Sequence, residues 1–433
     1  MSEVGVKDRI SGLPDSVLCH ILSFLPTKYA VRCSVLSTRW NNIWASVPNL
    51  DFENKDGSDS AAFMTFVERV LFMRDSSDIQ RFRLHCSSVG DFTRIYSWVR
   101  TAIVRNVVEL DLGVCKNGQT LELPKSLFMC KTLVVFKVKS NCITYKPPTS
   151  GCFPSLKFLH VIFERPDSES MEKIFTCCPV LEDLTIDVRY AGTQGWKLKI
   201  SAPELKTLKI ALHFSNANSY CETFVNAPKL ENLDLKQDIL SSYYWENIKS
   251  LVKASVNLYS HGAWHYGTFI SNATALLAGI SNVKYLSLSA HSLNACCLPT
   301  FDNLCELKLV LHDCYHWELL TDLLSRSPNL QSLIVEHKKD EVCAADYTIQ
   351  YYLTNVLYSE QRWSTPKSLP ICLVSHLKTI TIRGFKGYPH EKKAAMFLFE
   401  NGKVLDKMTI DTGLCKDFSP SQSVSRACQF ELM

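Results

Sequence analysis

The sequence lacks the long apolar segments and the single-sign charge blocks that mark membrane and nucleic-acid-binding proteins. No run approaches the roughly 18 apolar residues of a membrane-spanning helix, and residues 1–12 contain no apolar stretch typical of a secretory signal. The net charge is only +4 over 433 residues, with both signs interspersed. We therefore expect no membrane and no nucleic acid among the partners. Eighteen cysteines, scattered along a chain without a signal, favour a reducing cytoplasmic or nuclear environment.

Complete catalytic and cofactor motifs are also missing. The chain contains no P-loop, no GxGxxG, no GxSxG and no HExxH. No two cysteines are three residues apart, so the commonest zinc-binding spacing is absent. We therefore predict that the protein is not an enzyme and has no catalytic residue, no cofactor and no metal. The sequence leaves one alternative open, a metal bound by His312, Cys314 and His316, or by His261 and His265.

A strongly apolar helix pattern lies near the N-terminus. On a helical wheel for residues 15–25, one arc of about 160° is filled by Val17, Leu18, Ile21, Leu22, Phe24 and Leu25. This arc is wider than the roughly 100° stripe that a surface helix uses. Pro26 is expected to end the helix at Leu25, and a second helix is predicted to reach Leu36, with Thr27 as its N-cap.

A third short helix is predicted after Ser37, which can act as its N-cap. Its apolar residues repeat at i, i+3, i+4 and i+7, at Trp40, Ile43, Trp44 and Val47. A unit of about 40 residues is too small to be stable by burial alone. Its apolar surface must therefore be covered by the rest of the chain or by a partner protein.

This segment resembles the F-box motif. The matching positions are Leu13-Pro14, Leu18, Ile21-Leu22, Leu25-Pro26, Val31, Ser34, Leu36-Ser37, Arg39-Trp40 and Trp44. F-box proteins bind a Skp-type adaptor, which is attached to a cullin scaffold in an SCF ubiquitin ligase. The resemblance therefore implies an adaptor-binding surface formed by Leu13, Pro14, Leu18, Ile21, Leu22, Leu25, Pro26, Val31, Leu36, Trp40 and Trp44. Leu18, Ile21 and Leu22 are the expected helix-face anchors, and some of the tryptophan surface is alternatively expected to seat the segment on the rest of the chain.

A repeat with the spacing Leu-x-x-Leu-x-Leu runs through the middle of the chain. Its ten first positions are Val107, Leu133, Leu156, Leu181, Leu205, Leu230, Leu251, Val283, Leu304 and Leu330. The period is about 25 residues, inside the range of leucine-rich repeats. Each repeat is predicted to form a strand with inward leucines, and stacked repeats form a concave parallel sheet with one continuous core. Residues 171–178 and 317–326 are each predicted to form a helix or a helical turn on the convex side.

The repeats are irregular, because Asn or Cys is found eight residues after the first position only at Cys115 and Asn141.

Before the repeats, residues 53–60 are predicted to form a hinge, followed by a helix at 61–73. A strand is then predicted around Phe82 and a helix at 92–106. Six aromatic residues lie between Ser241 and Gly267, and they are expected to be buried between repeats or, alternatively, to line a loop at one rim.

Residues 377–410 are predicted to form a strand, a helix at 391–400 and a second strand, which continues the repeat pattern and can cap it. The region resembles the FBD domain of plant F-box/leucine-rich-repeat proteins. The matching residues are Trp363, Pro370, Cys372-Leu373, Leu377-Lys378, Ile382, Gly384-Phe385, Gly387, Glu400-Asn401, Val404-Leu405, Lys407-Met408 and Ile410. Residues 418–433 are largely polar and are predicted to fray.

Together these patterns predict an α/β protein with three parts. An F-box-like three-helix module occupies residues 8–50, an irregular leucine-rich-repeat solenoid 61–360, and an FBD-like β-α-β unit 361–415. The resemblance implies a substrate-recognition subunit of an SCF-type ubiquitin ligase, which links a Skp-type adaptor, and indirectly a cullin, to an unknown target protein. Two alternatives stay open: a repeat scaffold that acts without ubiquitin, and a receptor for a small molecule.

Overall fold

The structure is a computed structural model of the whole chain. It describes residues 10, 12–54, 59–75, 77–86, 92–114, 121–140, 143–144, 152–163, 175, 178–190, 195–214, 220–237, 241–258, 266–290, 293, 296–311, 317–338, 363, 365–366, 368–411 and 428–432. The chain divides into two compact units. The first unit is Met1–Ala191 with Lys199–Leu205, and the second is Gly192–Leu198 with Lys206–Met433.

The first unit begins with a small helical module. Its elements are α1 (Asp15–Leu22), α2 (Thr27–Arg32), the 3-10 helix η1 (Cys33–Val35), α3 (Trp40–Ile43) and the 3-10 helix η2 (Trp44–Ser46). Helix α1 starts after Pro14, whose backbone is extended, and it ends at Leu22. The backbone N–H of Leu25 bonds to the carbonyl oxygen of Leu22 at 3.0 Å, so the last turn tightens before Pro26. Proline disfavours helical backbone in the residue before it, which explains why α1 is shorter than predicted.

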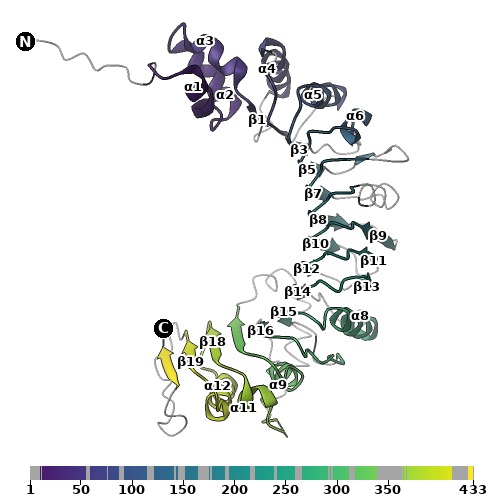
Figure 1. Cartoon of the computed structure of the whole chain (residues 1–433), viewed down its shortest axis with the longest axis vertical. Helices are drawn as coiled ribbons and strands as arrows, with labels where there is room; N and C mark the ends of the chain where they lie inside the picture. Colours follow the sequence, from purple (N-terminus) through teal and green to yellow (C-terminus); the bar gives the residue numbers. More distant parts are fainter. Residues whose placement is uncertain are drawn as a thin grey trace, which may run out of the picture. The chain divides into compact units, whose positions relative to one another are not determined.

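A layer of parallel strands follows the helical module in the first unit. The strands are β1 (Asn49–Asn54), β2 (Arg81–Cys86), β3 (Glu109–Val114), β5 (Val135–Ser140), β7 (Phe158–Phe163) and β8 (Asp183–Tyr190), paired in that order. The helices α4 (Ser60–Met73), α5 (Phe92–Val104) and α6 (Lys125–Phe128) lie on one side of these strands (Figure 1). Two short strands, β4 (Leu121–Glu122) and β6 (Ile143–Thr144), pair with each other.

The second unit repeats the same parallel design. Its strands pair in the order β10 (Thr207–Phe214), β12 (Asn232–Gln237), β14 (Lys253–Leu258), β15 (Tyr285–Ala290), β16 (Glu306–Leu311), β17 (Ser332–His337), β18 (Thr379–Arg383), β19 (Lys407–Ile410) and β20 (Gln429–Leu432). Each pair keeps the inward positions in register, for example Leu208 opposite Leu233. One face of the sheet is therefore uniformly apolar and the other is polar.

The apolar face of the second unit is covered by a second layer (Figure 1). This layer contains β11 (Cys221–Asn226), β13 (Ser242–Glu246), α8 (Tyr266–Gly279), α9 (Glu318–Ser325), α11 (Ile371–Ser375) and α12 (Pro389–Asn401). Strand β9 (Trp196–Ser201) begins in the second unit and ends in the first. The layers bury the repeat positions, because every residue of the ten predicted Leu-x-x-Leu-x-Leu triplets is at most 6% exposed.

The predicted α/β architecture is confirmed. The expected helices at 61–73, 92–106, 317–326 and 391–400 correspond to α4, α5, α9 and α12, and the strand around Phe82 is β2. The helix predicted at 171–178 falls almost wholly outside the described residues. The second helix of the module ends at Arg32 rather than Leu36, because the chain continues as the 3-10 helix η1.

Three further expectations are wrong. Glu53 and Asn54 do not belong to a hinge, because they pair with β2 as the end of β1. The end of the chain does not fray throughout, because β20 pairs in parallel with β19. Neither predicted cap acts through its side chain: Pro26 and Arg39 hold the N-cap positions, and the Thr27 hydroxyl accepts a hydrogen bond from the backbone N–H of Asp51 at 2.7 Å.

The aromatic segment is neither a rim loop nor uniformly buried where the structure describes it. Tyr243 is 6% exposed, whereas Tyr244 is 46% exposed on the other face of β13. The Tyr244 ring stacks on Phe224 of β11 with 4.5 Å between centroids. Strand alternation therefore explains why neighbouring aromatic residues differ in burial. Tyr259 and Trp264 lie outside the described residues.

Candidate binding surfaces

The helical module has its own compact core. Leu18, Leu22, Ala30, Trp40, Ile43 and Val47 are each at most 5% exposed and pack together. Leu13, Cys19, Cys33 and Trp44 cover the edge of this cluster. The guanidinium of Arg39 closes the base of the module, where its Nη2 atom lies 2.6 Å from Oδ1 of Asp15 and also donates to the carbonyl oxygen of Leu13. Both charged groups are partly exposed, so this pair orients α1 more than it stabilises the module.

Six large apolar side chains of the module remain exposed outside this core. Four of them lie on α1 and the following turn, and two at the end of η1: Val17, Ile21, Phe24, Leu25, Val35 and Leu36. Val35 is 85% exposed, Phe24 75% and Leu36 66%. We call these six residues the apolar ridge. Large apolar side chains gathered in one small module mark an interaction site in soluble proteins.

The eleven residues predicted to bind an adaptor divide into three groups by burial. Pro14, Ile21, Leu25, Pro26 and Leu36 are exposed, and Leu13, Val31 and Trp44 are half-buried. Leu18, Leu22 and Trp40 are buried in the module core. Of the three expected helix-face anchors, only Ile21 is therefore accessible. Leu18 and Leu22 point inward because the 160° arc is divided between the core and the ridge.

The module is joined directly to the first strand. Thr27 is buried at the start of α2 and holds the backbone of β1 through Asp51. The Asn49 side chain donates to the carbonyl oxygen of Ser23 at 3.3 Å. Buried Arg74 donates to the carbonyl oxygen of Val47, and burial lowers the pKa of this arginine. These contacts fix the module on the edge of the first unit.

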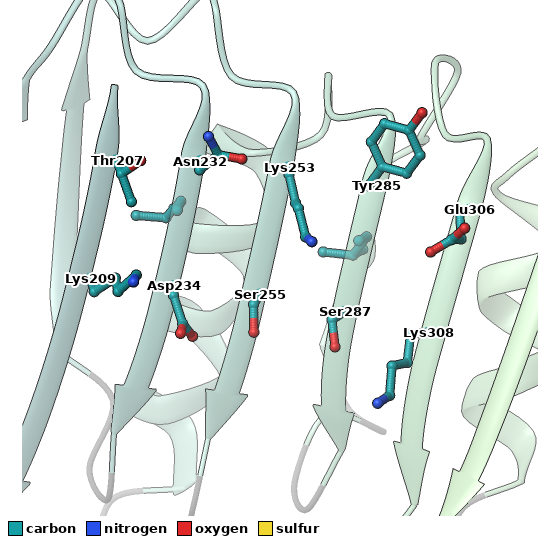
Figure 2. Close-up of a pocket in the computed structure, with 12 residues that line it drawn as sticks. Thr207, Lys209, Asn232, Asp234, Lys253, Ser255, Tyr285, Ser287, Glu306 and Lys308 are labelled. Atoms are coloured by element: carbon teal, nitrogen blue, oxygen red, sulfur yellow. The ribbon is translucent and has the colours of Figure 1, made fainter. Parts of the chain in front are cut away.

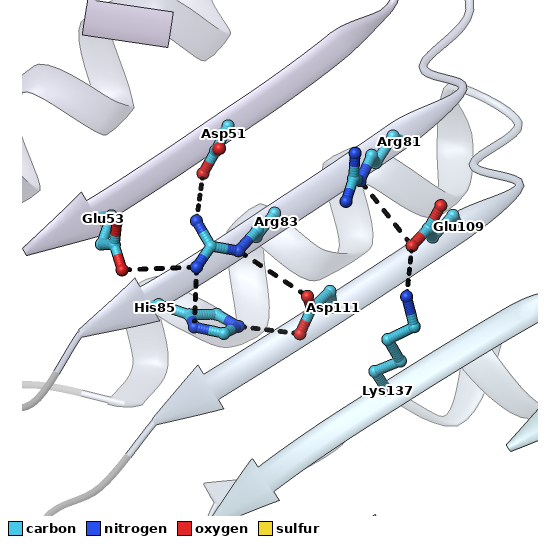
Figure 3. A network of polar contacts seen from close by, with 8 residues as sticks. All are labelled: Asp51, Glu53, Arg81, Arg83, His85, Glu109, Asp111 and Lys137. Atoms are coloured by element: carbon cyan, nitrogen blue, oxygen red, sulfur yellow. Dashed lines mark hydrogen bonds and ion pairs between the residues drawn. The ribbon is translucent and has the colours of Figure 1, made fainter. Parts of the chain in front are cut away.

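The polar face of the first unit carries a network of charges that pair with one another (Figure 3). Arg83 on β2 is its centre, with Nη1 2.7 Å from Oδ1 of Asp51 and Nη2 3.3 Å from Oε1 of Glu53. On the other side, the Arg83 Nε atom lies 3.7 Å from Oδ2 of Asp111. Burial alone lowers the pKa of Arg83, but the hydrogen bond and charge of Asp51, followed by those of Glu53, outweigh it and raise that pKa.

His85 joins the same network and shows how a glycine shapes it. Arg83 can only donate, so the His85 Nδ1 atom, 3.2 Å away, accepts. The ring proton is then on Nε2, which donates to Oδ1 of Asp111 at 2.8 Å. The imidazole lies over Gly113, where an added Cβ would be 2.9 Å from the ring. Burial alone raises the pKa of Asp111, but His85, Lys137 and Arg83 lower it.

A second branch of this network spans the next strands. Glu109 on β3 accepts from Lys137 on β5 at 2.8 Å, and the Arg81 Nε atom lies 3.7 Å from the same carboxylate oxygen. Acidic and basic residues therefore alternate from β1 to β5 (Figure 3). Because these charges already satisfy each other, the part of the face formed by β1 to β5 offers few free groups to a ligand.

The polar face of the second unit differs. It contains an open depression of about 500 Å³ over β10, β12, β14, β15 and β16 (Figure 2). Two rows of side chains in strand register line it, namely Thr207, Asn232, Lys253, Tyr285 and Glu306, and then Lys209, Asp234, Ser255, Ser287 and Lys308. Lys308 pairs with Glu336 at 2.6 Å. Lys209 and Lys253 form no ion pair with any described residue.

A buried polar cluster connects β17 to α12 in the second unit. The Nδ1 atom of His337 lies 2.7 Å from Oε1 of Glu391, whose other oxygen accepts from the backbone N–H groups of Lys386 and Tyr388 at 3.0 Å each. Burial alone raises the pKa of Glu391, but these hydrogen bonds lower it below its usual range. The connection before α12 also depends on Gly384, whose φ is +68° and whose added Cβ would lie 2.3 Å from the His337 carbonyl oxygen.

Several thiols are unsuited to nucleophilic chemistry. Burial raises the pKa of Cys221 to about 12, and those of Cys296 and Cys372 to about 11. These three thiols are therefore mostly protonated near neutral pH, which makes them poor nucleophiles. No group of three or more His, Cys, Asp or Glu residues among the described positions could hold a metal ion, and the candidates His312, Cys314, His316, His261 and His265 lie outside them. Over the same described positions, no helix is long and apolar enough to span a membrane.

Comparisons with known proteins agree with this architecture. Family models match the F-box domain at residues 10–52, the leucine-rich repeats of FBD-associated F-box protein At5g56370 at 95–268, and the FBD domain at 365–410. The Arabidopsis thaliana F-box/LRR-repeat protein At3g59200 is 33% identical over 377 residues, which cover 78% of this chain and 71% of that protein. The chain belongs to the F-box/LRR-repeat family.

Another relative extends this F-box/LRR-repeat likeness over the whole length. F-box/FBD/LRR-repeat protein At5g56420 from Arabidopsis thaliana is 29% identical over 445 residues, covering 98% of this chain and 99% of that protein. The domain combination is that of an F-box substrate-adaptor protein, and an F-box domain implies binding to a Skp-type adaptor. Proteins of the F-box/LRR-repeat family are typically adaptors rather than enzymes.

Sequence reasoning identified the F-box segment but missed the two polar sheet faces. Their signal is present in the strands: charged residues occupy the positions between the inward leucines, as in Asp51, Arg83, Asp111 and Lys137. It becomes readable only after the strands are aligned, because each strand alone contributes one or two charges. The register of the F-box/LRR-repeat sheet supplies that alignment.

Proposed function

We propose that this chain is the substrate-recognition subunit of an SCF-type ubiquitin ligase. In this proposal the F-box helices bind a Skp-type adaptor, and through it a cullin, while the repeat strands hold a target protein. The chain performs no bond chemistry and uses no cofactor. It acts in the cytoplasm or the nucleus, where the ligase components are found.

The observation that carries the proposal is the exposed apolar ridge beside a complete core. Leu18, Leu22 and Trp40 already fill the interior of the module, so the ridge is not needed for internal packing. Burying a large apolar side chain contributes about 1.5–3 kcal/mol. Covering the ridge therefore supplies on the order of 10 kcal/mol before the costs of association, which is enough for a specific complex.

The predicted adaptor residues take different roles in this proposal. Ile21, Leu25 and Leu36 contact the adaptor, together with Val35 and Phe24, which lie on the same ridge. Pro14 and Pro26 fix the ends of α1 and the start of α2. The buried and half-buried members, Leu13, Leu18, Leu22, Val31, Trp40 and Trp44, act indirectly by holding the helices that present the ridge.

Ubiquitin transfer is promoted by proximity. A target held by the repeats shares one assembly with the adaptor, the cullin and the charged conjugating enzyme. The effective concentration of the target's lysines near that enzyme then reaches the millimolar range that short tethers provide. The groups supplied by this chain bind and orient, and the transfer chemistry belongs to the other subunits.

Adaptor binding by purified protein tests the proposal. The variant Ile21→Ser plus Leu36→Ser removes two exposed ridge residues and is expected to weaken adaptor binding by about 100-fold, because each lost contact costs about 1–2 kcal/mol. The matched control, Phe72→Ser plus Val104→Ser, removes two exposed apolar residues of α4 and α5 and should bind as wild type. Wild-type protein that fails to bind, or ridge and control variants that bind equally, would overturn the proposal.

A further inference from the structure

Three lysines lie on neighbouring strands of the polar face of the second unit. Lys209, Lys236 and Lys253 occupy outward positions on the neighbouring strands β10, β12 and β14, and all three are exposed. We call them the basic patch. Asp234 lies among them, opposite Lys209 in the strand register and two residues before Lys236. It is the one acidic residue at the outward positions of these three strands, so the patch keeps a surplus of positive charge.

The basic patch is free to bind an anion, unlike the basic residues of the first unit. None of its lysines forms an ion pair with a residue in the described part of the chain. By contrast, Lys137 and Arg83 in the first unit are occupied by acidic residues of neighbouring strands. An incoming carboxylate at the basic patch therefore does not have to displace an internal partner.

The surroundings of the patch favour a polypeptide over a small molecule. Sites for small ligands are usually enclosed, whereas this depression, which Lys209 and Lys253 line and Lys236 does not, is open and also carries the hydroxyl and amide groups of Thr207, Asn232 and Ser255 (Figure 2). Neighbouring strands are about 4.8 Å apart, and outward residues on one strand are about 6.7 Å apart. In the strand register the three lysines lie at three different levels, so their Cα atoms are about 8–14 Å apart. Their long, flexible side chains have to bridge the difference from the spacing of about 6.7 Å between alternate side chains of an extended peptide.

We propose that an extended acidic segment of the target protein binds on this face, with carboxylates at alternate positions next to Lys209, Lys236 and Lys253. This inference rests on the proposed function, in which the repeats hold the target. It adds the chemical class of the recognised segment and assigns its site to the second unit. The hydroxyl and amide groups beside the patch hydrogen-bond the peptide backbone of the segment, because the residues between the carboxylates point away from the sheet.

The probe is a fluorescein-labelled decapeptide of alternating Ser and Glu, measured by anisotropy with the full-length chain. We expect it to bind about tenfold more tightly than the matching Ser and Gln decapeptide, and binding should weaken as salt is raised. The variant Lys209→Gln, Lys236→Gln, Lys253→Gln should lose at least about tenfold in affinity. The charge-preserving variant with Arg at the same three positions should retain binding. It provides a second test of the role of positive charge if the Gln variant fails to fold.

The matched control changes three exposed lysines outside the sheet strands, Lys249→Gln, Lys393→Gln and Lys403→Gln, so the net charge falls equally. It should bind as wild type. Equal affinity for the two decapeptides, loss of binding in the control, or full binding by the patch variant would each overturn the inference. Tricarballylate that competes as strongly as the Glu decapeptide at equal concentration would also overturn it, because the site would then recognise a free small acid.

Adaptor binding, measured on the same preparations, separates this inference from the proposed function. The patch variant is expected to bind a Skp-type adaptor as wild type does, because no patch residue belongs to the F-box module. Peptide binding without adaptor binding would overturn the ligase role and leave the site in place. Adaptor binding without selective peptide binding would overturn the site alone.

Discussion

At the residue scale, Glu391 illustrates how one side chain can serve two purposes. It caps the start of α12 by accepting from the backbone of Tyr388, and it pairs with His337 on β17. The side chain is 1% exposed, so its charge is stabilised by these partners and by the backbone N–H of Lys386 rather than by solvent. A buried carboxylate without them would be strongly destabilising. The pair therefore holds α12 of the FBD region against β17.

We predict that Glu391→Gln destabilises the protein by about 2–4 kcal/mol at pH 7. Because the pKa of Glu391 is lowered in the folded state, its contribution is complete above the unfolded pKa of about 4.3 and is lost as pH falls through the lower folded pKa. The gap between wild type and variant in urea unfolding should therefore narrow below about pH 4. The control Glu400→Gln, on an exposed residue of the same helix, should change stability by less than about 0.5 kcal/mol. A gap that stays constant with pH would contradict the assignment.

Predictions about the burial of single residues were correct where a sequence pattern allowed only one interpretation. The inward repeat leucines are fixed by their spacing alone, and all are buried. The apolar arc of α1 was harder to interpret, because the sequence of a helix that is apolar over 160° does not show which part of the arc faces the module core. Leu18 and Leu22 turned inward and Ile21 outward, a division decided by the packing of Trp40 and Ile43 against α1. That packing is a tertiary contact and has no local signal.

At the element scale, strand β20 closes the exposed edge of β19. Phe430 lies opposite Met408 in the register, and its ring is 5.7 Å from that of Phe399 on α12. Lys407 and Glu431 form an ion pair at 2.8 Å across the same two strands. An unpaired edge strand presents free backbone groups and is prone to open. The last strand therefore acts as the terminal cap of the second unit.

A chain that ends at Cys428 should show the effect of losing this cap. We expect the unfolding free energy to fall by about 1–3 kcal/mol, through the lost Phe430 contact and the lost backbone pairs. Hydrogen exchange at the β19 amides should accelerate at least about tenfold, because these groups become a free edge. A chain that lacks only Met433 serves as control and should exchange as wild type. Unchanged protection of β19 would show that β20 does not stabilise it.

Among the strands that carry the repeat spacing, periodicity predicted all but the first and the last, for identifiable reasons, whereas it did not predict β9, β11 and β13 of the second layer. Val47, Leu50 and Phe52 have the repeat spacing, and all three are buried. Val47 also completes the apolar pattern predicted for the third helix. It was therefore assigned to that helix, and strand β1 was not predicted. The apolar positions of β20, Phe430 and Leu432, follow a polar segment that suggested fraying. Strands at the ends of a repeat array have only one neighbour, so their sequences carry weaker signals.

At the scale of the whole molecule, the two units share a parallel design but differ in the chemistry of their polar faces. In the first unit, Arg83, Glu109 and their neighbours neutralise each other across strands. In the second unit, the basic patch leaves positive charge available. Repeat folds fix the backbone and leave outward positions free to vary. One architecture can therefore supply a rigid support and a recognition surface in the same chain.

This separation leads to a prediction for the reconstituted ligase. A lysine-bearing reporter protein that ends in the alternating Ser and Glu segment should be ubiquitinated when adaptor, cullin and conjugating enzyme are present. Ile21→Ser plus Leu36→Ser should reduce the rate at least about tenfold while reporter binding stays normal, because the high local concentration of lysines requires the adaptor link. The three Lys→Gln substitutions of the basic patch should reduce the rate by weakening reporter binding while the adaptor link stays intact. If either variant lost both interactions at once, the two surfaces would not act independently, and a tethering mechanism built from separate contacts would fail.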